Sequence, residues 1–122
     1  MRSSSSDSDV EVDPLLTTEY WKNKGNNEYK SKSYPQSIIS YTKAIQLIDD
    51  DTDNLSIKTS LLNNRAAAYL MLLQYKEAIA DCDYTIKIDE TVSKAYFRKA
   101  TALKGLGQLE QAIQALNKGN IV

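Results

Sequence analysis

The sequence contains no histidine and a single cysteine, Cys82, and these absences narrow the chemistry open to it. Histidine is the usual general base near neutral pH and the commonest metal ligand, so its absence argues against most hydrolytic and metal-dependent enzymes. One cysteine cannot form an internal disulfide, which favours a reducing compartment, and we predict a cytoplasmic protein. The sequence indicates no catalytic residues, no metal and no cofactor.

Long apolar runs and a strong charge of one sign are also missing. No apolar stretch approaches the roughly 20 residues that span a bilayer, so we expect no membrane insertion. The 15 basic and 16 acidic residues give a net charge of −1. Nucleic-acid binding depends on a dense basic surface that neutralises phosphates. The nearly equal numbers of basic and acidic residues therefore argue against a nucleic acid as the main partner.

The first 14 residues differ in composition from the rest of the chain. They contain one arginine, four acidic residues and a run of serines, with few apolar side chains. Such a segment cannot bury enough apolar surface to fold alone. We therefore predict a flexible acidic leader over residues 1–14 and one domain over residues 15–122.

From Thr17 onward the apolar pattern is helical, whereas strand signals are weak and glycines and prolines are few. Pro35 suits the first turn of a helix, and residues 49–54 form a loop rich in helix-capping residues. The connections between consecutive predicted helices are short, so neighbouring helices should pack as antiparallel hairpins. The sequence therefore predicts an all-α fold. The predicted helices are Thr18–Lys32, Pro35–Ile48, Leu55–Leu73, Lys76–Ile88, Val92–Lys104 and Leu109–Lys118.

The two later hairpins superpose when the sequence is shifted by 34 residues. A period of 34 combined with a helix-turn-helix pattern is the signature of the tetratricopeptide repeat (TPR). The matched pairs include Asn64 and Arg98, Ala66 and Ala100, Tyr69 and Leu103, Ala78 and Ala112, and Cys82 and Leu116.

The sequence resembles the TPR family over all but the leader, in units of about 18–51, 59–92 and 93–122. The first unit matches the family pattern with Trp21, Gly25, Tyr41 and Ala44. The resemblance implies three stacked hairpins that form a right-handed superhelix with a concave groove. The helix that usually caps such a stack is missing after the third unit. We therefore expect an exposed apolar patch at Ile113, Leu116 and Ile121.

Polar side chains recur on the inner helices at matched repeat positions. They read Lys22-x-x-x-Asn26 in the first unit, Asn64-Arg65 in the second and Lys94-x-x-x-Arg98 in the third. Cations at positions i and i+4 repel each other by roughly 0.2–0.5 kcal/mol, and an anionic ligand would relieve that repulsion. Solvation of the helices is the simpler interpretation of any one of these cations. Lys22, Asn26, Asn64, Lys94 and Arg98 together favour a binding site.

This set resembles the two-carboxylate clamp of TPR co-chaperones. The resemblance implies a protein-binding adaptor, not an enzyme. It would capture the C-terminal Glu-Glu-Val-Asp tail of cytosolic heat-shock chaperones of the seventy- and ninety-kilodalton classes. Lys22, Asn26, Asn64 and Lys94 would bind the terminal aspartate, and Arg98 an upstream acidic side chain or carbonyl. We interpret Arg65 as structural.

The valine of such a tail needs an apolar pocket, and Tyr29, Ala67 and Phe97 project to this side by repeat position. Helix packing explains the same three residues equally well. An alternative function is a structural assembly module, in which the groove or the third hairpin packs on another protein or another copy of this chain. The clamp residues would then be unused.

Overall fold

The computed structural model describes residues 17–48 and 54–120, so the predicted leader lies outside the described residues. The all-α prediction is confirmed, and every helix ends within two residues of its predicted position. The order along the chain is α1 (Thr18–Lys30), α2 (Tyr34–Gln46), α3 (Leu55–Met71), α4 (Tyr75–Ile88), α5 (Ser93–Gly105) and α6 (Leu109–Lys118).

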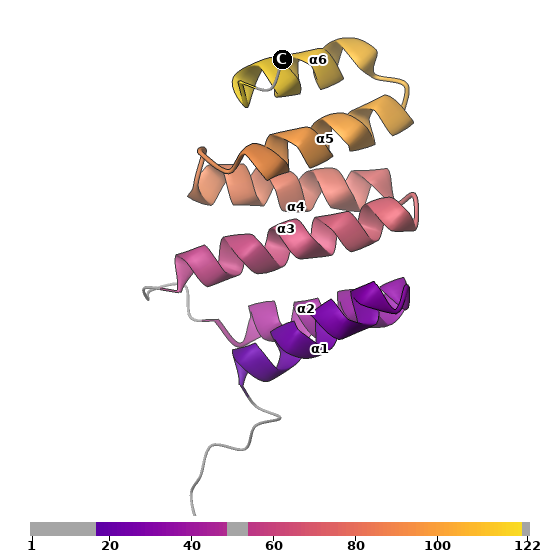
Figure 1. The fold of residues 1–122 in the computed structure, drawn as a ribbon. Helices are drawn as coiled ribbons and strands as arrows, with labels where there is room; N and C mark the ends of the chain where they lie inside the picture. Colours follow the sequence, from indigo (N-terminus) through magenta and orange to yellow (C-terminus); the bar gives the residue numbers. More distant parts are fainter. Residues whose placement is uncertain (1–16, 49–53, 121–122) are drawn as a thin grey trace, which may run out of the picture.

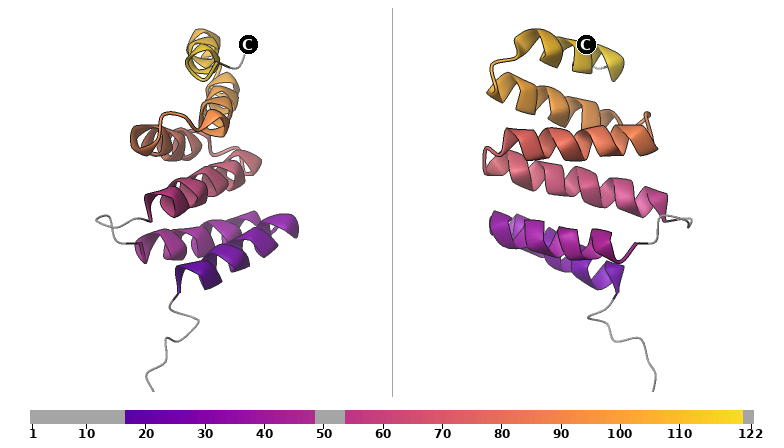
Figure 2. Two further views of the ribbon diagram at one scale, coloured as in Figure 1. Left: turned by 60° about the vertical axis from the view of Figure 1, so that its left-hand side comes forward. Right: turned by 180° about the vertical axis from the view of Figure 1, so that it is seen from behind.

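The helices stack in chain order, each packed against the next, from α1 at one end to α6 at the other (Figure 1). The contact between α3 and α5 links the inner helices of successive hairpins. Two further views show the same stack turning gradually along its length, as in a TPR superhelix (Figure 2). Across the described ranges, no helix has the length and apolar character needed to cross a membrane.

The three hairpins turn with the same backbone geometry. A residue with positive φ follows α1, α3 and α5: Lys32 at 64°, Leu73 at 60° and Gly107 at 80°. The next residue donates its N–H to a carbonyl five positions earlier, which closes a Schellman motif. These bonds run from Ser33 to Glu28 (2.8 Å), from Gln74 to Tyr69 (2.9 Å) and from Gln108 to Leu103 (2.9 Å). The predictions for α1 and α3 extended two residues into these turns.

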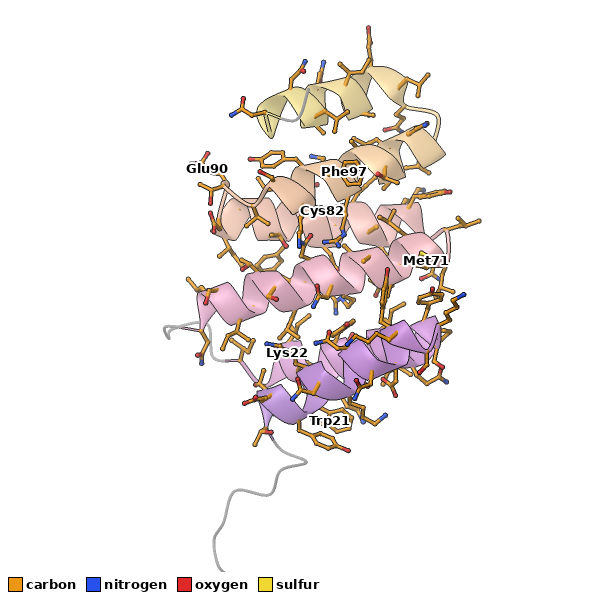
Figure 3. All side chains as sticks on the ribbon, viewed as in Figure 1. Trp21, Lys22, Met71, Cys82, Glu90 and Phe97 are labelled. Atoms are coloured by element: carbon orange, nitrogen blue, oxygen red, sulfur yellow. The ribbon has the colours of Figure 1, made fainter. Side chains whose placement is uncertain are left out.

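Small side chains let the helices approach closely in the core. Ala66, Ala78, Cys82 and Ala102 are fully buried in one cluster that joins α3, α4 and α5. Burial raises the pKa of the Cys82 thiol to about 12, so this cysteine is a core side chain and not a nucleophile. Figure 3 shows Cys82 within the stack.

Candidate functional site

A pocket of about 200 Å³ lies where side chains from four helices meet, and we call it the groove pocket. Pockets for small-molecule ligands usually measure about 300–1,000 Å³. The groove pocket is smaller, and it suits one side chain or a chain end better than a complete ligand. It is lined by Asn26, Tyr29 and Lys30 of α1, Tyr41 of α2, Asn64 and Ala67 of α3, and Arg98 of α5.

In the groove pocket, the side-chain oxygen of Asn26 accepts hydrogen bonds from both Tyr41 and Asn64. The Tyr41 hydroxyl donates to Asn26 Oδ1 at 2.6 Å, and Asn64 Nδ2 donates to the same oxygen at 3.4 Å. Because this oxygen is occupied twice, the group that Asn26 can offer to a ligand is its amide nitrogen, which is a donor. The arrangement favours a ligand that accepts hydrogen bonds.

Arg98 adds a buried cationic donor to the same pocket. Within the described part of the chain, its Nη1 atom is buried and has no hydrogen-bond partner. A buried donor left unsatisfied costs about 1–3 kcal/mol, and more when it is charged. An anion bound in the groove pocket would satisfy it with a charge-assisted hydrogen bond.

The structure brings together three of the five predicted clamp residues, Asn26, Asn64 and Arg98. Lys22 and Lys94 do not line the groove pocket. Each lies one helical turn before a lining residue, Lys22 before Asn26 and Lys94 before Arg98, and residues at i and i+4 share a helix face. Lys22 is partly buried on α1 and is labelled in Figure 3, whereas Lys94 is exposed.

Tyr29 and Ala67 line the groove pocket, but Phe97 does not. Phe97 is 56% exposed and lines a different depression, between α5 and α6 (Figure 3). Neighbouring residues of an α-helix are about 100° apart around the axis. Here Arg98 lines the groove pocket, whereas Phe97 lines the depression on the other side of α5 that faces α6. The prediction that Phe97 lines the same pocket as Arg98 therefore differs from the structure.

Two lining residues, Lys30 and Tyr41, were not among the predicted site residues. The sequence does contain a signal for Lys30, because this residue lies at i+4 from Asn26 and so on the same helix face. Tyr41 matches the repeat pattern as a packing residue of an outer helix, and its 2% exposure fits that role. Only the three-dimensional structure shows its hydroxyl at the groove pocket.

The interpretation of Arg65 as structural is confirmed. Its Nε and Nη2 atoms donate to both carboxylate oxygens of Asp81, at 2.7 and 2.6 Å, and Nη1 donates to Thr42 Oγ1 at 3.0 Å. Burial raises the pKa of Asp81, while the hydrogen bonds from Arg65 oppose that shift. The arginine thus ties α3 to α4 within one hairpin and to α2 of the preceding one.

No family model matches the chain, but solved structures resemble it closely. The second TPR domain of Spaghetti (RPAP3), bound to the HSP90 peptide SRMEEVD, is 33% identical with a TM-score of 0.75. That likeness covers 86% of this chain and 91% of the other. This chain belongs to the tetratricopeptide-repeat family.

Two further relatives define the type of TPR domain. The second TPR domain of human RPAP3, in complex with the HSP70 peptide SGPTIEEVD, is 34% identical with a TM-score of 0.74, and the match covers 88% of this chain and 83% of the other. Protein unc-45 homolog B of Xenopus tropicalis is 37% identical over 97 residues. The TPR chain spans only 10% of that protein's length, although the match covers 80% of the chain. The TPR domain described by this structure is a protein-binding module and not an enzyme.

Proposed function

We propose that this TPR domain is an adaptor that captures the C-terminal Glu-Glu-Val-Asp tail of cytosolic heat-shock chaperones of the seventy- and ninety-kilodalton classes. The observation that carries the proposal is the groove pocket. There, Asn26, Asn64 and Arg98 Nη1, from three different hairpins, present hydrogen-bond donors, and Arg98 Nη1 has no partner in the part of the chain that the structure describes. Similar TPR domains in complex with peptides ending in EEVD support it. The proposed compartment is the cytoplasm, where these chaperones are found.

A C-terminal aspartate has two carboxylates, and the proposed clamp supplies donors for both. Lys22, Asn26, Asn64 and Lys94 bind the terminal residue, the two lysines flanking the groove pocket. Charge-assisted hydrogen bonds of this kind are roughly twice as strong as neutral ones. Arg98 reaches an upstream acidic side chain or a peptide carbonyl.

The penultimate valine lies against Tyr29 and Ala67, which line the same pocket. Phe97 is left out of this role because it lines the depression between α5 and α6.

A titration with chaperone C-terminal peptides tests the function directly. A peptide ending in Glu-Glu-Val-Asp with a free carboxylate should bind with a Kd on the order of micromolar, or about −8 kcal/mol. Amidation of the terminus removes one carboxylate and should weaken binding by about ten- to hundredfold, because a hydrogen bond to a charged group contributes about 1.5–3 kcal/mol. Isothermal calorimetry at low and high salt should also show weaker binding as salt screens the charges.

Equal affinity for the free and amidated peptides would contradict the clamp. A peptide with the same composition in scrambled order serves as the control for non-specific attraction.

A second candidate function, an assembly module, is favoured by an apolar groove of about 430 Å³ between α5 and α6, which we call the third-hairpin groove. Leu109 and Ile113 in its lining are 59% and 56% exposed. The third-hairpin groove is the repeat equivalent of the core cluster that contains Ala102 of α5. Six residues that line the groove lie 34 positions after residues that form that cluster or pack against it. They are Ala100, Lys104, Leu109, Ala112, Ile113 and Leu116.

No helix among residues 17–48 and 54–120 covers the third-hairpin groove as α5 covers the preceding one. Of the three residues of the expected patch, Ile113 is exposed, Leu116 is partly buried, and Ile121 lies outside the described residues. In this second candidate function, another copy covers the groove across a two-fold axis, which buries the same apolar strip on both copies.

Sedimentation velocity over a range of concentrations tests the second function. A dimer should form as concentration rises, and Ile113→Glu should abolish it by burying a charge at the interface. Gln114→Glu, on the exposed neighbouring position of α6, adds the same charge as a matched control. A chain that stays monomeric at every concentration rejects this function.

A further inference from the structure

The hydrogen bond between Tyr41 and Asn26 connects the groove pocket to a helix that carries none of the predicted clamp residues. Tyr41 belongs to α2, the outer helix of the first hairpin, and only 2% of it is exposed. Its hydroxyl reaches Asn26 Oδ1 of α1 at 2.6 Å. The only other donor recorded to this oxygen among the described residues, Asn64 Nδ2, lies at a longer 3.4 Å. The hydrogen bond from Tyr41 is therefore the stronger of the two that Asn26 Oδ1 accepts.

The ring of Tyr41 has little freedom to move. A Cβ atom added to Gly25 would lie 2.8 Å from both Cδ1 and Cε1 of this ring, so the ring rests against the α1 backbone where glycine leaves room. Burial raises the pKa of Tyr41 to about 12, with smaller contributions from Tyr29 and Glu28 and an opposing one from Arg98. The hydroxyl thus stays protonated and able to donate at neutral pH.

The orientation of the Asn26 amide decides which sign of ligand the pocket attracts. With Oδ1 held by Tyr41, the amide nitrogen is the available group, and it can donate to a carboxylate. A flipped amide would present its oxygen, which repels a carboxylate and leaves the Tyr41 hydroxyl without its acceptor. A buried hydroxyl without a partner is unfavourable, so the two groups hold each other in one arrangement.

We propose that Tyr41 is a positioning residue for carboxylate recognition: it fixes the Asn26 amide with its nitrogen available to the terminal carboxylate of a bound peptide. The inference rests on the proposed function, because it concerns the same pocket and the same class of ligand. It adds a specificity-determining hydroxyl that contacts the ligand only through Asn26.

The test is a double-mutant cycle with Tyr41→Phe and Asn26→Ala, measured by peptide titration. Tyr41→Phe keeps the ring against Gly25 and removes only the hydroxyl, and it should weaken binding of the free-carboxylate peptide by about tenfold. Binding of the amidated peptide should change by less than about twofold. In the Asn26→Ala background the same change should have no further effect, because the amide that Tyr41 orients is gone.

Tyr96→Phe is the matched control. Tyr96 is a buried tyrosine whose hydroxyl donates to the Glu90 carbonyl at 3.0 Å, and it does not line the groove pocket. Its loss should leave peptide affinity unchanged.

A second measurement does not need the Tyr41 variant. In the free wild-type protein, the buried Tyr41 hydroxyl proton should exchange slowly enough to be detected by NMR. Asn26→Ala should remove that protection.

The outcomes separate the two claims. Absence of binding by the wild-type chain overturns the proposed function. Wild-type binding with an unchanged affinity in Tyr41→Phe, or an effect that persists fully in Asn26→Ala, overturns the positioning role alone. A Tyr41 hydroxyl proton that exchanges as fast in the wild type as in Asn26→Ala also overturns it.

Discussion

Asp81→Asn is expected to lower the free energy of unfolding by about 3 kcal/mol, the largest loss of stability that we predict for a single polar substitution. The carboxylate accepts two hydrogen bonds from Arg65, and the two side chains are only 18% and 7% exposed. Removing one partner of a buried pair leaves the other charge without compensation, at a cost of about 3–5 kcal/mol. Asparagine keeps the shape and one acceptor, which places the expected loss at the lower end.

Urea denaturation followed by circular dichroism measures this change, with Asp83→Asn as the matched control. Asp83 lies on the same helix two residues later and pairs with Lys99 at 2.7 Å, but its side chain is 52% exposed. An exposed pair contributes about 0–1 kcal/mol, so the control should be nearly neutral. Similar losses from both variants would show that the buried Arg65–Asp81 pair contributes no more to the free energy of unfolding than the exposed Lys99–Asp83 pair.

The joint replacement Arg65→Met with Asp81→Leu should recover much of the loss. Apolar side chains of similar size often replace a buried ion pair without reducing stability. Failure to recover would mean that the hydrogen bond from Arg65 to Thr42, at 3.0 Å, carries a larger share of the contact between hairpins.

Asn64→Ala and Lys94→Ala should each reduce affinity for a peptide ending in Glu-Glu-Val-Asp by about ten- to hundredfold, which takes a micromolar interaction toward the limit of detection. Each removes a donor proposed to meet a carboxylate, and such a bond contributes about 1.5–3 kcal/mol. Asn64 lines the groove pocket together with Asn26 and Ala67, whereas Lys94 lies one helical turn before the lining residue Arg98. Raising the salt concentration should therefore weaken peptide binding more in Asn64→Ala, which keeps the Lys94 charge, than in Lys94→Ala, which lacks it.

Asn27→Ala and Lys76→Ala are suitable controls, because both residues are exposed and neither lines the groove pocket. They remove the same chemical groups and should leave affinity within about twofold. Calorimetric titration gives the affinities, and circular dichroism verifies that the helices remain. Unaltered binding in both Asn64→Ala and Lys94→Ala would reject the clamp.

The repeat pattern made most of the fold predictable. The 34-residue shift that aligns Asn64 with Arg98 and Ala78 with Ala112 is a property of the chain alone, and it determined the hairpins and their order. Helix ends were predictable to within two residues because the alternation of apolar and polar residues stops where each hairpin turns. The errors at the ends of α1 and α3 came from Lys32 and Leu73, which adopt positive φ although neither residue type favours it. The prediction for α2 was also two residues too long.

The candidate site was predictable only in part. Spacing of four residues placed Asn26 with Lys22, and Arg98 with Lys94, on common helix faces. Spacing did not separate Phe97 from the groove pocket, because residues about 100° apart around a helix can line one pocket, as Tyr29 and Lys30 do, or two different ones, as Phe97 and Arg98 do.

The sequence by itself determined the repeat, the helices and the residue types that face the groove, because these depend on periodicities within one helix or between equivalent helices. The tertiary structure alone decided that Tyr41 donates to Asn26, that Arg65 pairs with Asp81 and that Arg98 Nη1 is buried without a partner among the described residues. These contacts join side chains at least 15 residues apart or depend on what surrounds one atom. Such relations follow from the packing angle of whole helices, which no local pattern encodes.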